Sequence, residues 1–303
     1  MANRYWIGGS GNWSDPSHWS TSSGGAWGAS VPTLADDVFF DEYSHLGPEI
    51  VQNNTFDSDT WWGKNGAEIT ISGGVANYDN TPFNSTDGIY ALDVLTPGNR
   101  YRALWEVKNY VAGSVVWTDG NTYIGTSKSA NGVYESIYTT SGTAIWPMGS
   151  SADLALDNIY VREYFSLNVN ADVSINCRSF ICQPDVSAQI LSTTYDVYIN
   201  GDISLNSNTI FSITNSHDIV LNSQGTSYIS IDASVFSIDR MYFNGANAYI
   251  FNHDLSAGIK LHSQWQSCDI DFNDYDITCD EIQFTGCDHV WLGNGTITVL
   301  NPY

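Results

Sequence analysis

The sequence predicts an all-β protein that combines a jelly-roll β-sandwich with a right-handed parallel β-helix. Apolar residues alternate or come in short bursts, and Gly, Asn, Ser or Asp interrupts them within about ten residues, so no helical period develops. The chain has 26 Gly, 11 Trp and 18 Tyr but only 14% charged residues, a composition typical of strands and turns. A short motif also recurs in the C-terminal half at a nearly constant spacing, which favours a solenoid.

Two changes in composition and repeat pattern divide the 303 residues into three predicted parts. Residues 1–51 are rich in Trp and Gly and are expected to cap the solenoid. Residues 52–166 are expected to form the sandwich, which interrupts the solenoid pattern. Residues 167–303 are expected to form the β-helix.

The N-terminal part carries four tryptophans that are expected to plug the open end of the solenoid. They are Trp6, Trp13, Trp19 and Trp27, and a sugar-binding platform is the alternative use of the same rings. Three acidic residues flank the apolar run 38–40, namely Asp36, Asp37 and Asp41. We expect solvated turn carboxylates at these positions, with a calcium site as the alternative.

Strand alternation in the middle part separates core aromatics from candidates for ligand contact. Side chains of one strand point alternately to its two faces, so Tyr101, Trp105 and Val107 share the core face. The candidate platform for stacking on a sugar ring consists of Trp62, Tyr78, Tyr123 and Trp146. Packing or interface contact is the alternative role for each of them.

The C-terminal part repeats a pentapeptide of Asp, apolar, any, apolar and Asn. It occurs at residues 172–176, 196–200, 202–206, 218–222 and 269–273, with a weaker copy that ends at Asn244. The closing residues Asn176, Asn200, Asn222 and Asn244 are 24, 22 and 22 residues apart, which predicts about six coils. We therefore expect Asn200, Asn222 and Asn244 to lie above one another in successive coils. A Greek-key sandwich with coincidental spacing is the alternative.

The first 41 residues, RYWIGGSGNWSDPSHWS followed by GGAWGASVPTLADDVFFD, resemble the opening of a family of uncharacterised phage and bacterial surface proteins that continue as β-solenoids. The matching positions are Trp6, Gly8, Gly9, Gly11, Trp13, Ser14, His18, Trp19, Pro32, Asp36, Asp37 and Asp41. This resemblance implies a structural protein of a tailed-phage virion, displayed on the virion surface as a capsid decoration, head fibre or tail fibre component. Because the first residues, MANRYW, contain no apolar h-region of a signal peptide, we expect the protein to be made in the host cytoplasm. The implied partners are other capsid or tail proteins, and we expect a homotrimer, because viral solenoids commonly associate side by side as three copies. A bacterial surface adhesin is the alternative.

Residues 55–165 are similar to the CenC-type carbohydrate-binding module, a β-sandwich of jelly-roll type. The similarity lies in the runs TPGNRYRALWEVKNYVAGSVVW, SANGVYESIYTT and ADLALDNIYVREYF, which occur in that order. It implies a carbohydrate-binding-module-like fold for this part and a glycan as ligand.

Composition excludes several classes of partner. With 33 acidic and 10 basic residues the net charge is −23, which repels nucleic acid and anionic membranes. No stretch approaches the roughly 18 apolar residues of a membrane span, so we expect no membrane insertion. We expect no cofactor and no metal. The five cysteines are expected to be small buried side chains, with disulfides or a zinc site at Cys279, Cys287 and His289 as alternatives.

Acidic residues are densest at Asp269, Asp271, Asp274, Asp276, Asp280 and Glu281. Two carboxylates about 5 to 9 Å apart suffice for glycoside hydrolysis, so a polysaccharide-degrading, tailspike-like enzyme is an alternative function. However, Asp269 belongs to the repeat, and the sequence contains no nucleophile elbow, HExxH motif or P-loop. We therefore expect a protein that is not an enzyme.

Overall fold

The computed structural model describes residues 2–83, 86–192, 194–213, 217–223, 225–233, 235–245, 248–263 and 267–300. The chain divides into two compact units, residues 1–45 with 166–303 and residues 46–165. The described residues form strands and turns, with two short 3₁₀ turns, η1 (Pro16–His18) and η2 (Glu42–His45). Among them there is no helix of the length and apolar character needed to span a membrane.

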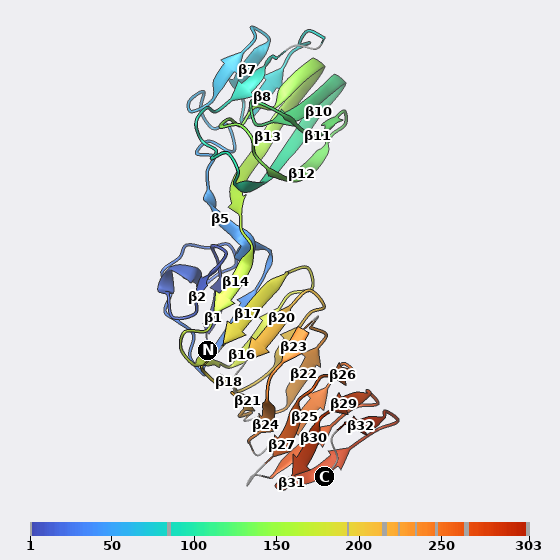
Figure 1. Cartoon of the computed structure of the whole chain (residues 1–303). Helices are drawn as coiled ribbons and strands as arrows, with labels where there is room; N and C mark the ends of the chain where they lie inside the picture. The colour runs from blue at the N-terminus through green and yellow to red at the C-terminus, as the bar shows by residue number, and fades with distance from the viewer. Residues whose placement is uncertain are drawn as a thin grey trace. The chain divides into compact units, whose positions relative to one another are not determined.

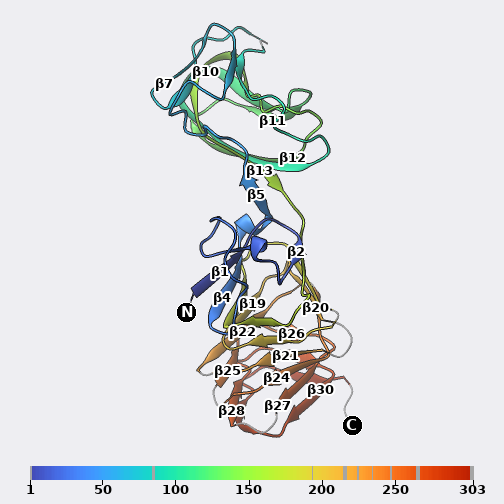
Figure 2. The ribbon, with the colours of Figure 1, turned by 90° about the vertical axis from the view of Figure 1, so that its left-hand side faces the viewer.

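The first unit is a parallel β-solenoid of about six coils, and each coil contributes one strand to each of three faces (Figure 1). The first sheet contains, in order, β3 (Trp19–Ser20), β1 (Ala2–Trp6), β4 (Asp36–Phe40), β16 (Ser179–Cys182), β19 (Ile203–Leu205), β22 (Ser227–Ile231), β25 (Ala248–Phe251), β28 (Cys268–Asp271) and β31 (Cys287–Trp291). The second sheet contains β15 (Ile175–Cys177), β18 (Val197–Ile199), β21 (Asp218–Leu221), β24 (Arg240–Phe243), β27 (Lys260–Ser263) and β30 (Glu281–Phe284). Figure 2 shows β19, β22, β25 and β28 stacked along one side of the solenoid.

The remaining strand of each coil belongs to one of two further sheets. The third sheet contains β2 (Gly11–Asn12), β14 (Leu167–Asn170), β17 (Ala188–Ser192), β20 (Ile210–Ile213) and β23 (Val235–Ser237). The fourth contains β26 (Leu255–Ser256), β29 (Ile277–Cys279) and β32 (Ile297–Val299). Among the described residues, every strand pair in this unit is parallel except β1 with β3, which confirms the solenoid over the Greek-key alternative.

The asparagine spacing predicts the register of the second sheet from its second strand onward. Ile199 pairs with Leu221 and Leu221 with Phe243, so Asn200, Asn222 and Asn244 follow paired residues in successive coils. The backbone N–H of Asn222 donates to the carbonyl of Ile199 at 2.8 Å, which confirms their stacking. Asn176 is the exception, because it pairs with Tyr198 and therefore lies two residues out of register.

Alternation along these strands builds the solenoid core. Val197, Ile219, Met241 and Leu261 pair in sequence across four coils, and each side chain is completely buried. Burial of a side chain of this size contributes about 1.5 to 3 kcal/mol, so each added coil extends a continuous apolar stack.

The N-terminal segment belongs to the same unit and supplies strands to its first coil, since β4 pairs with β16 and β2 with β14. Trp6, Trp13 and Trp19 are fully buried in the solenoid core. Trp13 meets Trp19 edge-on with ring centroids 4.7 Å apart and stacks on Phe180 at 6.1 Å. Three of the four tryptophans thus fill the core next to the first coil, whereas Trp27 is 58% exposed and is no part of this packing.

Asp36, Asp37 and Asp41 are buried, so the expectation of solvated turn carboxylates was wrong. The first two lie within β4, a strand enclosed between β1 and β16, where each has a partner. Asp36 accepts hydrogen bonds from the backbone N–H and the hydroxyl of Thr33 at 3.0 and 2.9 Å, and Asp37 forms an ion pair with Arg178. Asp41 accepts a backbone N–H from η2 at 2.9 Å, while burial raises the pKa of its carboxyl.

The second unit is an antiparallel, nearly closed sandwich around its own core. Its strands are β5 (Leu46–Glu49), β6 (Gly63–Asn65), β7 (Ile69–Ser72), β8 (Val75–Tyr78), β9 (Gly88–Tyr90), β10 (Arg100–Thr118), β11 (Tyr123–Lys128), β12 (Gly132–Thr139) and β13 (Met148–Tyr164). As strand parity predicts, Tyr101, Trp105 and Val107 are buried.

A bend in β10 closes this sandwich. Trp105 and Trp117 are separated by 12 residues, which would span about 40 Å in a straight strand. Their rings nevertheless stack at 4.8 Å, so the strand folds back across the core. The pairing of β10 with β13 shifts register on both sides of residue 112, and Gly113 has a φ of +73°. A Cβ at Gly113 would lie 2.0 Å from the carbonyl oxygen of Ser151, so only glycine fits at the bend.

Candidate functional site

Two of the four predicted platform aromatics lie in the sandwich core. Tyr78 is fully buried, and its hydroxyl donates to the carbonyl of Pro147 at 2.7 Å. Burial raises the pKa of this hydroxyl well above its usual range. Trp62 is 5% exposed and donates its indole N–H to the carbonyl of Asn53 at 2.9 Å. A ring enclosed by protein cannot stack on a ligand, so these two residues serve packing.

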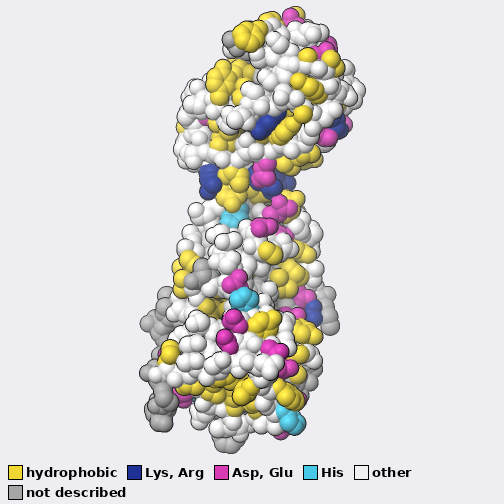
Figure 3. All heavy atoms as spheres, turned by 90° about the vertical axis from the view of Figure 1, so that its right-hand side faces the viewer, with side chains coloured by type: hydrophobic (Ala, Val, Ile, Leu, Met, Phe, Trp, Pro, Cys, Tyr) yellow, Lys and Arg dark blue, Asp and Glu magenta, His cyan; other side chains and the backbone are white. Residues whose placement is uncertain are grey.

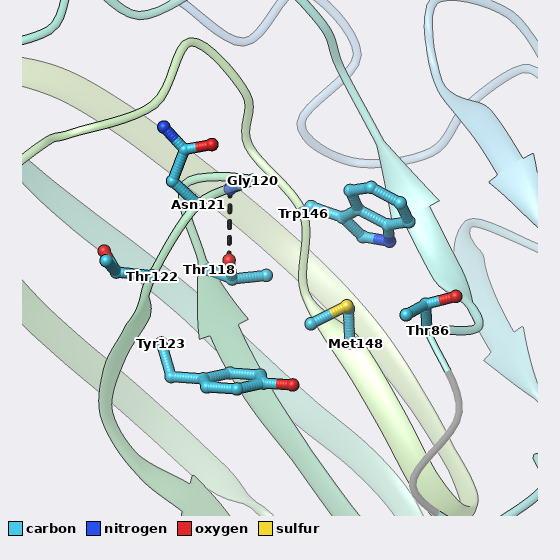
Figure 4. Close-up of a pocket in the computed structure, with 8 residues that line it drawn as sticks. All are labelled: Thr86, Thr118, Gly120, Asn121, Thr122, Tyr123, Trp146 and Met148. Atoms are coloured by element: carbon cyan, nitrogen blue, oxygen red, sulfur yellow. Dashed lines mark hydrogen bonds between the residues drawn. The ribbon is translucent and has the colours of Figure 1, made fainter.

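The other two aromatics meet at one hollow of the sandwich, which has a volume of about 210 Å³ (Figure 4). Tyr123 begins β11 and is 68% exposed, whereas Trp146 precedes β13 and is partly buried. The remaining lining consists of Thr86, Thr118, Gly120, Asn121, Thr122 and Met148. In Figure 4 the rings of Tyr123 and Trp146 lie on either side of the Met148 side chain.

Asp119 holds the loop that carries this hollow. Its buried carboxylate accepts the backbone N–H groups of Asn121 and Thr122 at 2.9 and 2.7 Å, within its own turn. It also accepts the backbone N–H groups of Ser141 and Gly142 at 2.7 and 3.1 Å, on a second loop. Desolvation favours the protonated carboxyl, but these hydrogen bonds outweigh it and hold the pKa of Asp119 well below its usual range. The two loops are therefore fixed to each other through one charged side chain.

The lining suits recognition of a neutral polar ligand. An exposed tyrosine ring offers an apolar face, and hydroxyl and amide side chains can donate to and accept from ligand hydroxyls. The Trp146 ring also contacts the ring of Tyr90, with centroids 5.5 Å apart. None of the eight lining residues is Asp, Glu, Lys, Arg or His, so the side chains of the lining carry no formal charge at neutral pH.

Tyr123 and Trp146 were predictable from the sequence, whereas Asn121 and Asp119 were not. The run of residues 118–121, Thr-Asp-Gly-Asn, is a turn signature and marks the loop. It does not show that the carboxylate reaches a second loop about 20 residues further along the chain.

Comparisons with known proteins leave the family open, because neither a family model nor a curated protein matches the chain. Among solved structures, the chain is similar to the CBM22-1–GH10 modules of endo-1,4-β-D-xylanase 10B from Clostridium thermocellum in complex with xylohexaose, at 20% identity and a TM-score of 0.29. It is also similar to the CBM22-1–CBM22-2 tandem domain of Xyn10C from Paenibacillus barcinonensis, at 12% identity and a TM-score of 0.33.

These matches cover 38% and 42% of this chain, and only 28% and 48% of the two matched chains. Likeness at this level carries no argument about ligand or activity, so the function of the hollow has to be judged from its own residues.

Two carboxylates of the C-terminal acidic run, and one from the preceding coil, accept backbone amides of neighbouring coils. Asp276 accepts the backbone N–H of Thr296 from the next coil at 2.6 Å, and Asp274 that of Asn294, also at 2.6 Å. One coil earlier, Asp254 accepts the backbone N–H of Asp276 at 2.8 Å. These aspartates satisfy turn amides between coils, which is a structural use of the charge.

The candidate zinc residues do not converge. Cys279 lies in β29 of the fourth sheet, whereas Cys287 and His289 lie in β31 of the first. His289 faces Asp269 of the neighbouring coil, with Nδ1 2.9 Å from a carboxylate oxygen. Within the described ranges, no three or more His, Cys, Asp or Glu residues are grouped so that they could hold a metal ion.

Proposed function

We propose that the sandwich binds a glycan at the hollow bordered by Tyr123 and Trp146. The observation that carries this proposal is the combination of two aromatic rings with hydroxyl and amide side chains in a lining without charged groups. Sugars present apolar ring faces and many hydroxyls, and such a lining matches both. The loop that bears the site is ordered by Asp119 before any ligand arrives, which lowers the entropy cost of binding.

The proposed role is passive binding without catalysis. The carboxylates of the C-terminal acidic run support this role where they accept amides of neighbouring coils, as Asp274 and Asp276 do. A polysaccharide-degrading enzyme is the alternative, and it would need two carboxylates about 5 to 9 Å apart with access to substrate.

We further propose a structural protein on the virion surface of a tailed phage, with a bacterial adhesin as the alternative. The support is the residue pattern of the first 41 positions. In this proposal the protein is made in the host cytoplasm, contacts other capsid or tail proteins and forms a homotrimer. Exposed apolar side chains on the solenoid, such as Tyr228 at 47% and Val235 at 46%, provide contact surface for such an assembly.

Glycan binding is tested by affinity electrophoresis of the full chain in gels that contain xylan, mannan, β-glucan or host-cell polysaccharide. We expect one of these polymers to retard the wild-type protein and Tyr123→Ala and Trp146→Ala each to weaken retardation about tenfold, equivalent to about 1.4 kcal/mol. Trp291→Ala, which removes a half-exposed ring from the solenoid unit, is the matched control and should behave as wild type. Equal retardation of all four proteins, or no retardation by any polymer, would refute the site.

Assembly is tested separately by measuring the mass of the purified protein with and without calcium. Few basic side chains appear on the face drawn in Figure 3, and the net charge is −23, so three chains must associate through apolar contacts or bridging cations. A monomer under both conditions would contradict the trimer.

A further inference from the structure

Two cysteines face each other at the last coils of the solenoid. Cys268 begins β28 and Cys287 begins β31, and the two residues are direct partners in the parallel pairing of these strands. Their Sγ atoms are 2.9 Å apart. Among the five cysteines, we find this short sulfur–sulfur contact for this pair alone within the described residues.

The backbone geometry of this pair suits a covalent bond. Neighbouring strands are about 4.8 Å apart, and disulfides form across Cα separations of about 4.4 to 6.8 Å. An S–S bond is about 2.05 Å long, so the sulfurs need to approach by less than about 1 Å. We propose that Cys268 and Cys287 form a disulfide that joins the last two strands of the first sheet.

The two thiols differ in access, which sets the order of the reaction. Cys268 is 1% exposed, and burial, followed by its contact with Cys287, raises the pKa of its thiol. Cys287 is only partly buried, and its Sγ lies 3.1 Å from the hydroxyl oxygen of Ser263. An oxidant from solution therefore reaches Cys287 first.

The oxidant in the proposal is a low-molecular-weight disulfide, RSSR. Cys287 loses its proton to solvent, its thiolate attacks one sulfur of RSSR, and one RS⁻ leaves and takes up a proton. Cys268 then loses its proton and attacks the Cys287 sulfur of the mixed disulfide, which releases the second RS⁻. The protein loses two hydrogen atoms, and RSSR is reduced to two RSH.

The location gives the bond a structural effect. Among the described residues, β31 is the last strand of its sheet and pairs with β28. The bond encloses residues 268–287, about one coil, and ties the terminal coil to the strand beside it in this sheet.

The other cysteines are suitable controls. Cys177 and Cys182 are buried in β15 and β16, and Cys279 is buried in β29. Burial raises the pKa of Cys182 to about 12 and that of Cys279 to about 11, so few of these thiols are ionised at neutral pH.

The test is to incubate the full chain with oxidised glutathione, denature it, alkylate free thiols with N-ethylmaleimide and record intact and peptide masses. We expect three of the five cysteines to be alkylated, together with a linked Cys268–Cys287 peptide that dithiothreitol separates. Cys287→Ser should leave all four remaining thiols alkylated, whereas Cys279→Ser should keep the linked peptide.

Three outcomes would overturn the inference. They are five alkylated cysteines in the oxidised wild type, a linked peptide with a different pair, or glutathione retained on Cys287 without ring closure. Because the readout is a covalent link, it is independent of whether the sandwich binds a glycan.

Discussion

Replacing Asp119 with alanine removes the carboxylate that joins two loops of the sandwich. Four backbone N–H groups lose their acceptor, whereas the buried hydroxyl of Thr140 keeps the carbonyl of Gly142 as an acceptor at 3.0 Å. A buried donor left without a partner costs about 1 to 3 kcal/mol, and water can replace the carboxylate only at the exposed side of the turn. If two donors remain unsatisfied, the free energy of unfolding should fall by about 2 to 6 kcal/mol.

The assay for this prediction is urea unfolding of the full chain, combined with hydrogen exchange to assign the transition of the sandwich. In Asp119→Ala, the amides of Asn121, Thr122, Ser141 and Gly142 should exchange faster, because all four bond to the missing carboxylate. Asp79→Ala, which removes an exposed carboxylate from the same unit, should change the unfolding free energy by less than about 0.5 kcal/mol. Equal stability of wild type and Asp119→Ala would show that the carboxylate does not clamp the loops.

Asp119 should also make the stability of the sandwich depend on pH, and the direction of this dependence follows from its pKa. The pKa of Asp119 is lowered in the folded state, so its stabilising contribution is complete above the unfolded-state value of about 3.9. The contribution is lost as pH falls from there towards the folded-state pKa. Wild-type sandwich stability should therefore decline below about pH 4 more steeply than that of Asp119→Ala, and parallel declines would contradict this assignment.

Three further predictions concern the core, the bend and the acidic run. Phe211→Ala should destabilise the solenoid by about 3 to 5 kcal/mol, because its buried ring packs between two other phenylalanines; the exposed Phe83→Ala is the control, and urea midpoints give the comparison. Gly113→Ala should lower the melting temperature of the sandwich, since its Cβ would strike a backbone carbonyl, and an unchanged transition would show that β10 bends elsewhere. Asp271→Asn and Asp276→Asn should leave polysaccharide binding intact; loss of a polysaccharide-cleaving activity in either folded variant would establish the enzyme alternative.

The sequence predicted the solenoid register where the closing asparagine keeps its place on the strand. Asn200, Asn222 and Asn244 follow equivalent strands because each coil between them has 22 residues. The interval from Asn176 to Asn200 has 24 residues, but the coil again has 22, since Ile175 pairs with Val197, so Asn176 falls inside β15, two residues before the position equivalent to Asn200. The pentapeptide also occurs in β19 and β28 of another sheet, because any inward-alternating strand that ends at a turn favours the same residues.

The candidate site was predictable only in part. Strand parity shows which side chains share a face of the strand, but it does not show which of the two faces is buried in the core. Tyr78 lies on the same face of β8 as the buried Ala76, and nothing local in the sequence identifies that face as the core. Tyr123 and Trp146 are 23 residues apart, and the hollow between them depends on a long-range contact. The buried aspartates of β4 were missed for the same reason, since Arg178 is 141 residues from its partner Asp37.

The sandwich interrupts the first coil, and this has a consequence for the order of folding. Gly11 in β2 pairs with Val169 in β14, so that coil closes only after the chain has returned from 120 intervening residues, 46–165. Closing an unstructured loop of that length costs about 4 kcal/mol of chain entropy. The sandwich brings its own ends together, because Leu46 pairs with Tyr164 and Glu49 with Arg162. Once the sandwich has formed, the chain before residue 46 and the chain after residue 165 start from paired strands. The solenoid can then nucleate from these two segments before the remaining coils add one after another.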